Sequence, residues 1–154
     1  MNILSLGYKE VRLPKRTVKN EDIVKFADLT GDKNRIHLDD MFAANSPFGK
    51  RISHGLFSIA MIFGLMDETH LFDDLIVILK EIERVEFVKP VYDSDIISGR
   101  VRIIEKTESF RHDGFYVTAE IVGLKENDGD QEFVKMRAKF KLITLINERH
   151  ERDK

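Results

Sequence analysis

The chain contains no cysteine among its 154 residues. This absence excludes disulfide bonds, thiolate metal sites and cysteine nucleophiles, and it fits a reducing compartment, so we expect a cytoplasmic protein. Long apolar runs are also lacking. The longest nearly apolar run, residues 56–66, has 11 residues, whereas a membrane-spanning helix needs roughly 20. Residues 1–13 lack the basic start and the apolar stretch of a signal peptide, so no association with a membrane is expected.

An excess of charge of one sign is missing as well. Lysine and arginine number 25 against 27 aspartates and glutamates, and the net charge is −2. The single basic cluster, residues 135–141, alternates with apolar residues, which is typical of the solvent face of a strand. No nucleic-acid partner is therefore expected. The chain has no repeat and no proline- or glycine-rich linker, and its length suits one domain over residues 1–154.

The first half of the chain predicts one strand and two helices. Residues 8–18 can form the strand. Asn20 is the expected N-cap of the first helix, because acidic residues follow in its first turn. Gly31 can adopt the left-handed conformation that ends this helix. Residues 32–37 are then expected in a loop, and residues 39–44 in a short helix that an aspartate caps.

The second half predicts a buried helix and a sheet. Apolar side chains surround the axis of a helix over residues 54–67, and such a helix belongs inside a core. Four strands follow, and the last three alternate apolar and polar side chains. These strands are residues 75–88, 97–103, 115–121 and 134–142, with a hairpin turn at 127–130. We therefore expect an α+β fold, in which an antiparallel sheet with one apolar face curls around the helix.

Two short segments carry the candidate chemical groups. Asp32 and His37 lie five residues apart, directly after the helix-ending Gly31. The tripeptide Ser-His-Gly at 53–55 begins 16 residues after His37 and opens the apolar helix. Addition of water to a polarised carbonyl compound needs an acid/base pair and a hydrogen-bond donor to the carbonyl oxygen. The aspartate, the histidine and a glycine amide at a helix start supply these groups.

Each of these groups also has a purely structural explanation. Asp32 could simply cap the next turn, and His37 could be an ordinary surface or packed histidine. A close approach of two backbones would by itself require a glycine at Gly55. His54 is interpreted as structural more often than chemical, and Ser53 is a candidate helix cap.

A metal site and a serine nucleophile fit the sequence less well. The candidate metal ligands are His37, Asp39, Asp40 and His54. Their spacing matches no compact zinc pattern, and His54 is remote in sequence from the other three. No serine lies in a G-x-S-x-G elbow. We therefore expect neither a bound metal nor a serine nucleophile.

Several segments together carry a family resemblance. They are Asn20-Glu21-Asp22-Ile23 with Phe26-Ala27, Gly31-Asp32-x-Asn34-x-Ile36-His37-Leu38-Asp39, Ile52-Ser53-His54-Gly55, and Val85-Glu86-Phe87-Val88-Lys89-Pro90-Val91 followed by Asp95. In this order and spacing they resemble the MaoC-like, R-specific enoyl-CoA hydratases of the hot-dog fold superfamily. The resemblance covers nearly the whole chain.

The resemblance implies a sheet wrapped around a central helix and a homodimer, or a higher homo-oligomer, with active sites near the subunit interface. Asp32 and His37 fall on the catalytic aspartate and histidine of the family. Gly55 matches the glycine whose N–H contributes to the oxyanion hole, and Asn34 matches an asparagine that supports the site. The substrate would be an acyl thioester of coenzyme A or of acyl-carrier protein, and no further cofactor is implied.

The expected substrate contacts are Asn34, Arg35 and His54. Arg35 stands where the family motif usually has proline, and its cation is hypothesised to favour an acidic acyl group. The cations that can meet the phosphates of coenzyme A are Lys33, Arg35, Lys50 and Arg51, each of which can equally be an ordinary surface cation.

The expected function is a reversible hydratase/dehydratase that adds water to a trans-2-enoyl thioester. Asp32 would act as general base on the water, His37 would hold the same water, and the Gly55 N–H would polarise the thioester carbonyl. The resemblance implies the (R)-3-hydroxyacyl product. Two alternatives stay open: an acyl-CoA thioesterase, in which water attacks the carbonyl carbon, and a non-catalytic hot-dog protein that binds acyl thioesters.

Overall fold

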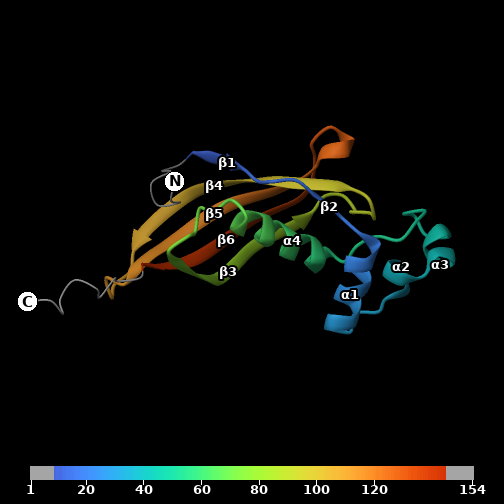
Figure 1. The fold of residues 1–154 in the computed structure, drawn as a ribbon, viewed down its shortest axis with the longest axis horizontal. Helices are drawn as coiled ribbons and strands as arrows, with labels where there is room; N and C mark the ends of the chain where they lie inside the picture. Colours follow the sequence, from blue (N-terminus) through green and yellow to red (C-terminus); the bar gives the residue numbers. More distant parts are fainter. Residues whose placement is uncertain (1–8, 145–154) are drawn as a thin grey trace, which may run out of the picture.

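The computed structural model describes residues 9–144, which form one antiparallel sheet, four α-helices and a short 3-10 turn (Figure 1). The strands are β1 (Glu10–Arg12), β2 (Arg16–Thr17), β3 (Leu75–Phe87), β4 (Ile96–Glu108), β5 (Gly114–Lys125) and β6 (Gln131–Thr144). The helices are α1 (Asn20–Thr30), α2 (Arg35–Leu38), α3 (Asp40–Ala44) and α4 (Gly55–Asp67), and the turn η2 (Glu126–Asp128) follows β5. The sheet order is β1-β4-β5-β6-β3, with β2 also paired to β4. The predicted α+β class is confirmed.

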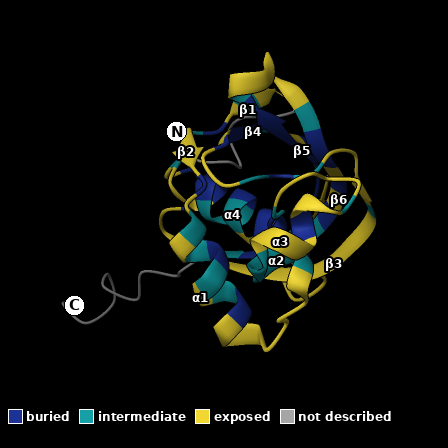
Figure 2. Ribbon diagram, turned by 90° about the vertical axis from the view of Figure 1, so that its right-hand side faces the viewer, coloured by how far each residue is buried: buried dark blue, intermediate teal, exposed yellow. Residues whose placement is uncertain are grey.

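Strands β4, β5 and β6 show the alternation that the sequence predicts. In β6, Val134, Met136 and Ala138 are buried, whereas Lys135 and Arg137 between them are exposed. The buried side chains join those of α4 in one core, and Figure 2 shows the sheet curving around this helix. Each large apolar side chain buried in this way contributes about 1.5–3 kcal/mol. The hot-dog arrangement expected from the resemblance is therefore present.

The central helix α4 is buried on one side only. Ile62 and Leu65 have no exposed surface, whereas Leu56 is 69% exposed and Ala60 is exposed. Burial on all sides, which the apolar circumference of this helix predicts, is not reached within the described residues. The single sheet covers one side of α4, and no described element covers the outer turns at Leu56 and Ala60.

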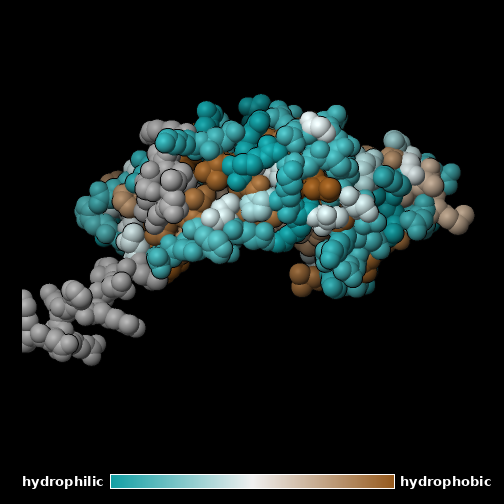
Figure 3. Space-filling view, turned by 45° about the horizontal axis from the view of Figure 1, so that its top comes forward, coloured by the Kyte–Doolittle hydropathy of each residue, from teal (hydrophilic) through white to brown (hydrophobic). Residues whose placement is uncertain are grey.

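Strand β3 lies at one edge of the sheet and, among the described strands, pairs only with β6. A run of its side chains is exposed, from 38% to 45% of each: Ile76, Val77, Ile78 and Leu79. Figure 3 shows another face of the molecule, where brown apolar patches interrupt a mostly hydrophilic surface. An unpaired apolar edge strand is a template for pairing with another chain. No helix in the described part of the chain is long and apolar enough to cross a membrane.

Three local predictions need correction. Only residues 9–18 of the predicted first strand are described, and they form two short strands. Pro14, which has no N–H to donate to a ladder, lies between them. Asn20 is not the N-cap of helix α1, because it is already the first helical residue and Lys19 occupies the N-cap position. The Asn20 N–H donates to Asp93 Oδ1 at 2.8 Å. Residues 32–37 are not all loop, because α2 begins at Arg35.

Other local predictions are confirmed. Gly31 ends α1 in the left-handed conformation, with φ of 78°. Asp39 caps α3, because its carboxylate accepts from the Phe42 N–H at 2.9 Å. Gly129 makes the turn between β5 and β6 with φ of 72°. A fourth local prediction needs correction: Ser53 does not cap α4, because the N-cap residue of this helix is His54.

Candidate active site

The candidate groups meet where α1, α2 and the start of α4 come together at one end of the sheet (Figure 1). Gly31 turns the chain back after α1, so that Asp32 and then His37 face the beginning of α4. One carboxylate oxygen of Asp32 and one ring nitrogen each of His37 and His54 lie within 4.8 Å of one another. The structure thus brings together groups that are up to 22 residues apart.

The Asp32 side chain is exposed and only lightly bonded within the protein. Its Oδ1 accepts from the Asn34 N–H at 3.3 Å. This contact corresponds to the turn-capping explanation of Asp32, yet it leaves the second carboxylate oxygen free of hydrogen bonds from the described residues. A separation of up to 4.8 Å from a histidine nitrogen suits a water molecule that bonds to both groups.

The His37 ring is half-buried and is held in one tautomer. Its Nδ1 lies 2.8 Å from the Ile52 carbonyl oxygen, which can only accept, so Nδ1 carries the proton and Nε2 keeps its lone pair. Burial lowers the pKa of His37 below 6.5, and the neighbouring His54 lowers it further. The Ile52 hydrogen bond and the Asp32 carboxylate oppose this shift only partly. The ring is therefore neutral at pH 7 and can accept a hydrogen bond at Nε2.

His54 is buried, with 3% of its surface exposed. Its Nε2 donates to the backbone oxygen of Asp32 at 2.9 Å. The His54 ring stacks on that of His37, with centroids 3.8 Å apart and planes inclined by 30°. The centroid of the Phe26 ring lies 5.0 Å from that of His54. The structural interpretation of His54 fits this environment. Because His54 has almost no exposed surface, it has little area with which to contact a substrate, as the sequence analysis predicts it to do.

Gly55 is the first residue of α4, where backbone N–H groups have no partner within the helix. Its N–H points out of the helix start, and the helix dipole favours a developing negative charge there. A Cβ added to Gly55 would lie 2.9 Å from the ring of Phe87 at the end of β3. The close neighbour of Gly55 is therefore a side chain and not a second backbone, and the role of its N–H in an oxyanion hole stays a prediction.

Asn34 and Arg35 are engaged within their own segment. The Asn34 side-chain oxygen caps α2 by accepting from the Ile36 N–H at 3.1 Å. Arg35 donates to Asp39 from two nitrogens, at 3.0 and 2.7 Å, and lies 4.6 Å from the centre of the Phe42 ring. The cation of Arg35 is thus paired, which weakens the hypothesis that it selects an acidic acyl group. The roles of both residues in substrate binding stay predictions.

Of the other three cations predicted to contact phosphates, two form ion pairs with carboxylates. Lys33 is paired with Asp28 at 3.0 Å, and Arg51 with Asp40 at 2.7 Å. Lys50 has no ion pair among the described residues and lies 4.4 Å from the centre of the Tyr92 ring. Among these cations, Lys50 is therefore the one best able to accept a phosphate.

The three groups at the site resemble a metal-ligand set, but the two rings are poorly oriented for a shared ion. A metal lies in the plane of each imidazole that binds it, at about 2 Å from the nitrogen. The rings of His37 and His54 are stacked, with centroids 3.8 Å apart and planes inclined by 30°, so an ion in the plane of one ring at this distance lies out of the plane of the other. The set also includes Asp32 rather than the Asp39 and Asp40 weighed from sequence.

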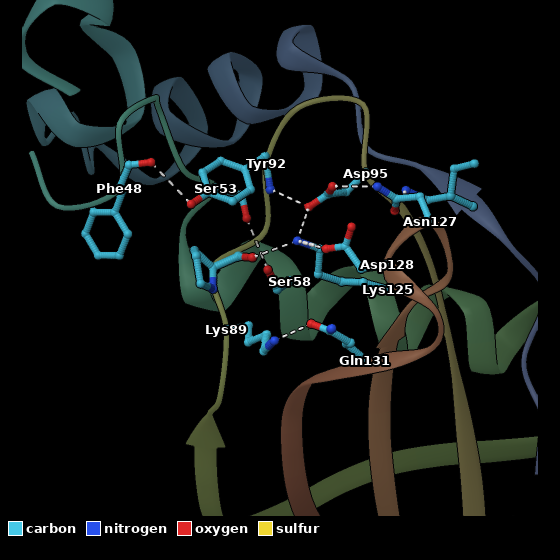
Figure 4. A network of polar contacts seen from close by, with 12 residues as sticks. Phe48, Ser53, Ser58, Lys89, Tyr92, Asp95, Lys125, Asn127, Asp128 and Gln131 are labelled. Carbon is cyan, nitrogen blue, oxygen red and sulfur yellow. Dashed lines mark hydrogen bonds and ion pairs between the residues drawn. The ribbon is translucent and has the colours of Figure 1, made fainter. Parts of the chain in front are cut away.

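A buried polar network supports the segment before α4, and the sequence analysis missed it (Figure 4). Lys125 and Asp95 form an ion pair at 3.0 Å with only 5% and 8% of their side chains exposed. Lys125 also pairs with Asp128 at 2.9 Å, and Asn127 donates to Asp95 at 3.2 Å. Burial lowers the pKa of Lys125, but the hydrogen bonds to Asp128 and Asp95 outweigh it and leave the pKa raised.

This network is connected to the site through Tyr92. Asp95 accepts from the Tyr92 N–H at 2.8 Å, and Tyr92 in turn forms a β-bridge with Ile52. The Ser53 N–H donates to the Val91 oxygen at 2.8 Å. Ile52 is the residue whose carbonyl holds His37. One sequence signal was present: Lys125 continues the inward alternation of β5, where an unpaired charge is costly.

Comparisons with known proteins agree with this fold. Residues 6–140 match the family described as MaoC like domain. The 3-hydroxybutyryl-CoA dehydratase of Methylorubrum extorquens is 36% identical over 102 residues, which cover 66% of this chain and 62% of that protein. The chain spans 62% and 28% of the lengths of the first two curated relatives that it matches.

Solved structures show the same fold. A monoamine oxidase regulatory protein of Archaeoglobus has a TM-score of 0.81 at 24% identity, over 95% of this chain and 96% of that chain. The R-hydratase PhaJ1 of Pseudomonas aeruginosa has a TM-score of 0.74 at 21% identity, over 90% and 83%. These likenesses show the fold alone. The family match, by contrast, covers most of the sequence, and the chain belongs to the MaoC-like dehydratase family.

Proposed function

We propose that this protein is a reversible hydratase/dehydratase that interconverts a trans-2-enoyl thioester and the (R)-3-hydroxyacyl thioester. The observation that carries the proposal is that the Asp32 carboxylate and a His37 nitrogen lie within 4.8 Å of each other and of a nitrogen of His54, the residue directly before the Gly55 amide that opens α4. The relative named 3-hydroxybutyryl-CoA dehydratase supports a four-carbon acyl-CoA as the first substrate to test. No cofactor beyond the coenzyme A of the substrate is required.

Each group has one task in this reaction. Asp32 accepts a proton from a water molecule that Nε2 of His37 holds by accepting its second hydrogen bond. The water oxygen bonds to C3, and the electron pair of the double bond moves toward the thioester oxygen. The Gly55 N–H stabilises the negative charge on this oxygen. The proton then passes from Asp32 to C2, which restores the carboxylate.

The same proposal includes a dimer formed through β3. This strand offers an unpaired edge with exposed apolar side chains, and its last residue, Phe87, lies against Gly55. A second copy paired there would cover the apolar edge and lie beside the thioester site. Light scattering at working concentration tests this part. A dimer is expected, and a monomer would contradict an active site near a subunit interface.

The test of the reaction is purified protein with crotonyl-CoA, in which loss of the enoyl-thioester absorbance and release of free thiol are followed together. Wild type, Asp32→Asn and His37→Gln are compared. Asp28→Asn is the matched control, because Asp28 is exposed on α1 and pairs only with Lys33. Loss of absorbance without thiol, greatly reduced in the first two variants and unchanged in the control, is expected. Thiol release would identify a thioesterase instead.

Longer, branched and dicarboxylic enoyl-CoAs, and the same acyl groups on acyl-carrier protein, extend the assay if crotonyl-CoA is not consumed. The dicarboxylic substrates also test Arg35, with Arg35→Pro as the variant. An unchanged preference between monoacid and diacid substrates in this variant would end the hypothesis of an acidic acyl group. Failure on every thioester would overturn the enzyme proposal and favour a binding protein.

A further inference from the structure

His54 lies at the centre of the site without facing solvent. It is 3% exposed and directly precedes Gly55. One side of its ring stacks on His37, and Phe26 from α1 packs against it with centroids 5.0 Å apart. A side chain enclosed in this way has little contact with substrate, but it touches both parts of the site that carry the proposed chemistry.

The hydrogen bond from His54 is the long-range tie of the Asp32 segment. The other hydrogen bonds of Asp32 to the described residues are local, from the Asp32 N–H to the Thr30 hydroxyl at 3.3 Å and from the Asn34 N–H to the Asp32 carboxylate at 3.3 Å. The bond from His54 Nε2 to the Asp32 backbone oxygen, at 2.9 Å, instead connects this segment to α4. The position of Asp32 relative to Gly55 therefore depends on His54.

The stacking contact of His54 acts on His37, the second catalytic candidate. The Ile52 carbonyl fixes one edge of the His37 ring, at Nδ1, but a single hydrogen bond leaves the ring free to rotate about that edge. The flat face of His54, with centroids 3.8 Å apart, removes this freedom. Together the two contacts define the direction of Nε2, the atom that holds the water.

We propose that His54 is a positioning residue, whose hydrogen bond sets the Asp32 backbone and whose ring face sets the His37 imidazole. This inference rests on the proposed function, in which Asp32 and His37 act on one water. It replaces the predicted substrate contact of His54 by an action through two neighbours. Misplacement of a catalytic group by about 1 Å costs on the order of 100-fold in rate, so the effect should appear in kcat.

Two substitutions separate the two contacts. His54→Gln keeps an N–H donor near the Nε2 position but loses the ring, whereas His54→Phe keeps a ring but loses the donor. Each is expected to lower kcat by about 10- to 100-fold and to change KM by less than about twofold, because His54 does not touch the substrate. The matched control is His70→Gln, since His70 is 79% exposed and pairs with Asp73.

The nitrogen resonances of His37 provide a readout that needs no substrate. In the wild type, Nδ1 should carry the proton and Nε2 should not, as the Ile52 contact requires. The titratable groups that act on His37 are His54 and Asp32. Removal of the covering ring in His54→Gln should expose His37 to water and raise its pKa toward 6.5, whereas His54→Phe should leave its burial nearly unchanged.

The outcomes distinguish failure of this inference from failure of the proposed function. If no thioester is consumed but the His37 resonances respond as expected, the positioning role stands and the hydratase proposal falls. Wild-type kcat in both folded variants, or an unchanged His37 titration in His54→Gln, would overturn the positioning role. If one variant does not fold, as judged by its thermal transition, the other variant still decides, because each tests one contact.

Discussion

The two parts of the candidate site are held in different ways. Asp32 lies in an exposed segment whose hydrogen bonds are mostly local. Residues 52–55, by contrast, are supported through Tyr92 by the buried Lys125–Asp95 pair. In the proposed reaction the first part would supply the side-chain chemistry, and the second would supply the backbone amide. Changes in the first part should therefore alter activity with little loss of stability, whereas changes in the second should cost both.

The largest effect is expected from Asp32→Asn. Loss of a positioned general base lowers kcat by about 100- to 10,000-fold. The side chain is exposed, so the free energy of unfolding should change by less than about 0.5 kcal/mol. Crotonyl-CoA hydration and urea denaturation measure the two quantities. A large loss of stability in this variant would show that Asp32 is a structural cap and would break the comparison.

Lys125→Met, in contrast to Asp32→Asn, is expected to lose stability together with activity. Removal of one partner from a buried ion pair costs about 3–5 kcal/mol, because Asp95 is left buried and uncompensated. Activity should fall as well, since Ile52 loses the support of the Tyr92 segment. Lys135→Met is the control: Lys135 is 47% exposed and pairs with Glu132 on the surface, where a pair contributes at most about 1 kcal/mol. Equal stability of the two variants would contradict the supporting role of the buried pair.

The sequence predicted the regular parts of the fold and the identity of the candidate residues. Strands β4 to β6 follow their period, because one face of each strand packs against α4. Gly31 and Asp39 end and cap helices by local chemistry that is visible in the sequence. The resemblance supplied Asp32, His37 and Gly55, which the structure brings to one place.

What the sequence did not predict depends on contacts between distant segments. The stacking of His54 on His37 and the pairing of Lys125 with Asp95 arise only when α4 and the sheet are in place. The break at Pro14, by contrast, follows from local chemistry, because proline has no N–H to donate to a ladder. The partial exposure of α4 could not be predicted from its apolar circumference, because that pattern does not say which neighbour covers each side.

A smaller effect is expected at Gly55, where a substitution would both crowd the Phe87 ring and move the amide proposed to bind the thioester oxygen. In Gly55→Ala the new Cβ would lie 2.9 Å from the Phe87 ring, so overpacking should cost about 1–3 kcal/mol and displace the amide. Phe87→Ala in the same chain opens this space. Recovery of both stability and activity in the double variant is expected. Recovery of stability alone would show that the amide also needs the Phe87 ring beside it.

The pH dependence of activity tests the state of His37. Its pKa lies below 6.5, and protonation at Nε2 removes the acceptor that holds the water, so activity should fall at a pH below 6.5. Because the folded pKa is lowered, the contribution of His37 to stability is present above 6.5 and declines as the pH falls toward the folded pKa. A loss of kcat that begins above 6.5 would contradict the buried, neutral ring.

The smallest effect on activity is expected from Glu126, which lies next to the Lys125 network. Hydrogen bonds from Lys15 and Ser98, with a further one from Arg12, lower its pKa from 4.5 to about 2. Its contribution to stability is therefore present above 4.5 and is lost as the pH falls through about 2. Glu126→Gln should flatten the dependence of unfolding on pH in this range. An equally steep dependence would mean that other carboxylates cause it.

The central claim is that Asp32 and His37 act on the same water molecule. A double-mutant cycle of kcat/KM for crotonyl-CoA hydration, with Asp32→Asn, His37→Gln and the double variant, tests it most directly. The effects of substituting residues that act as one unit are not additive. The kcat/KM of the double variant should therefore lie within a few-fold of that of the slower single variant. If the two losses instead multiply in full, the residues act independently and the proposed arrangement is wrong.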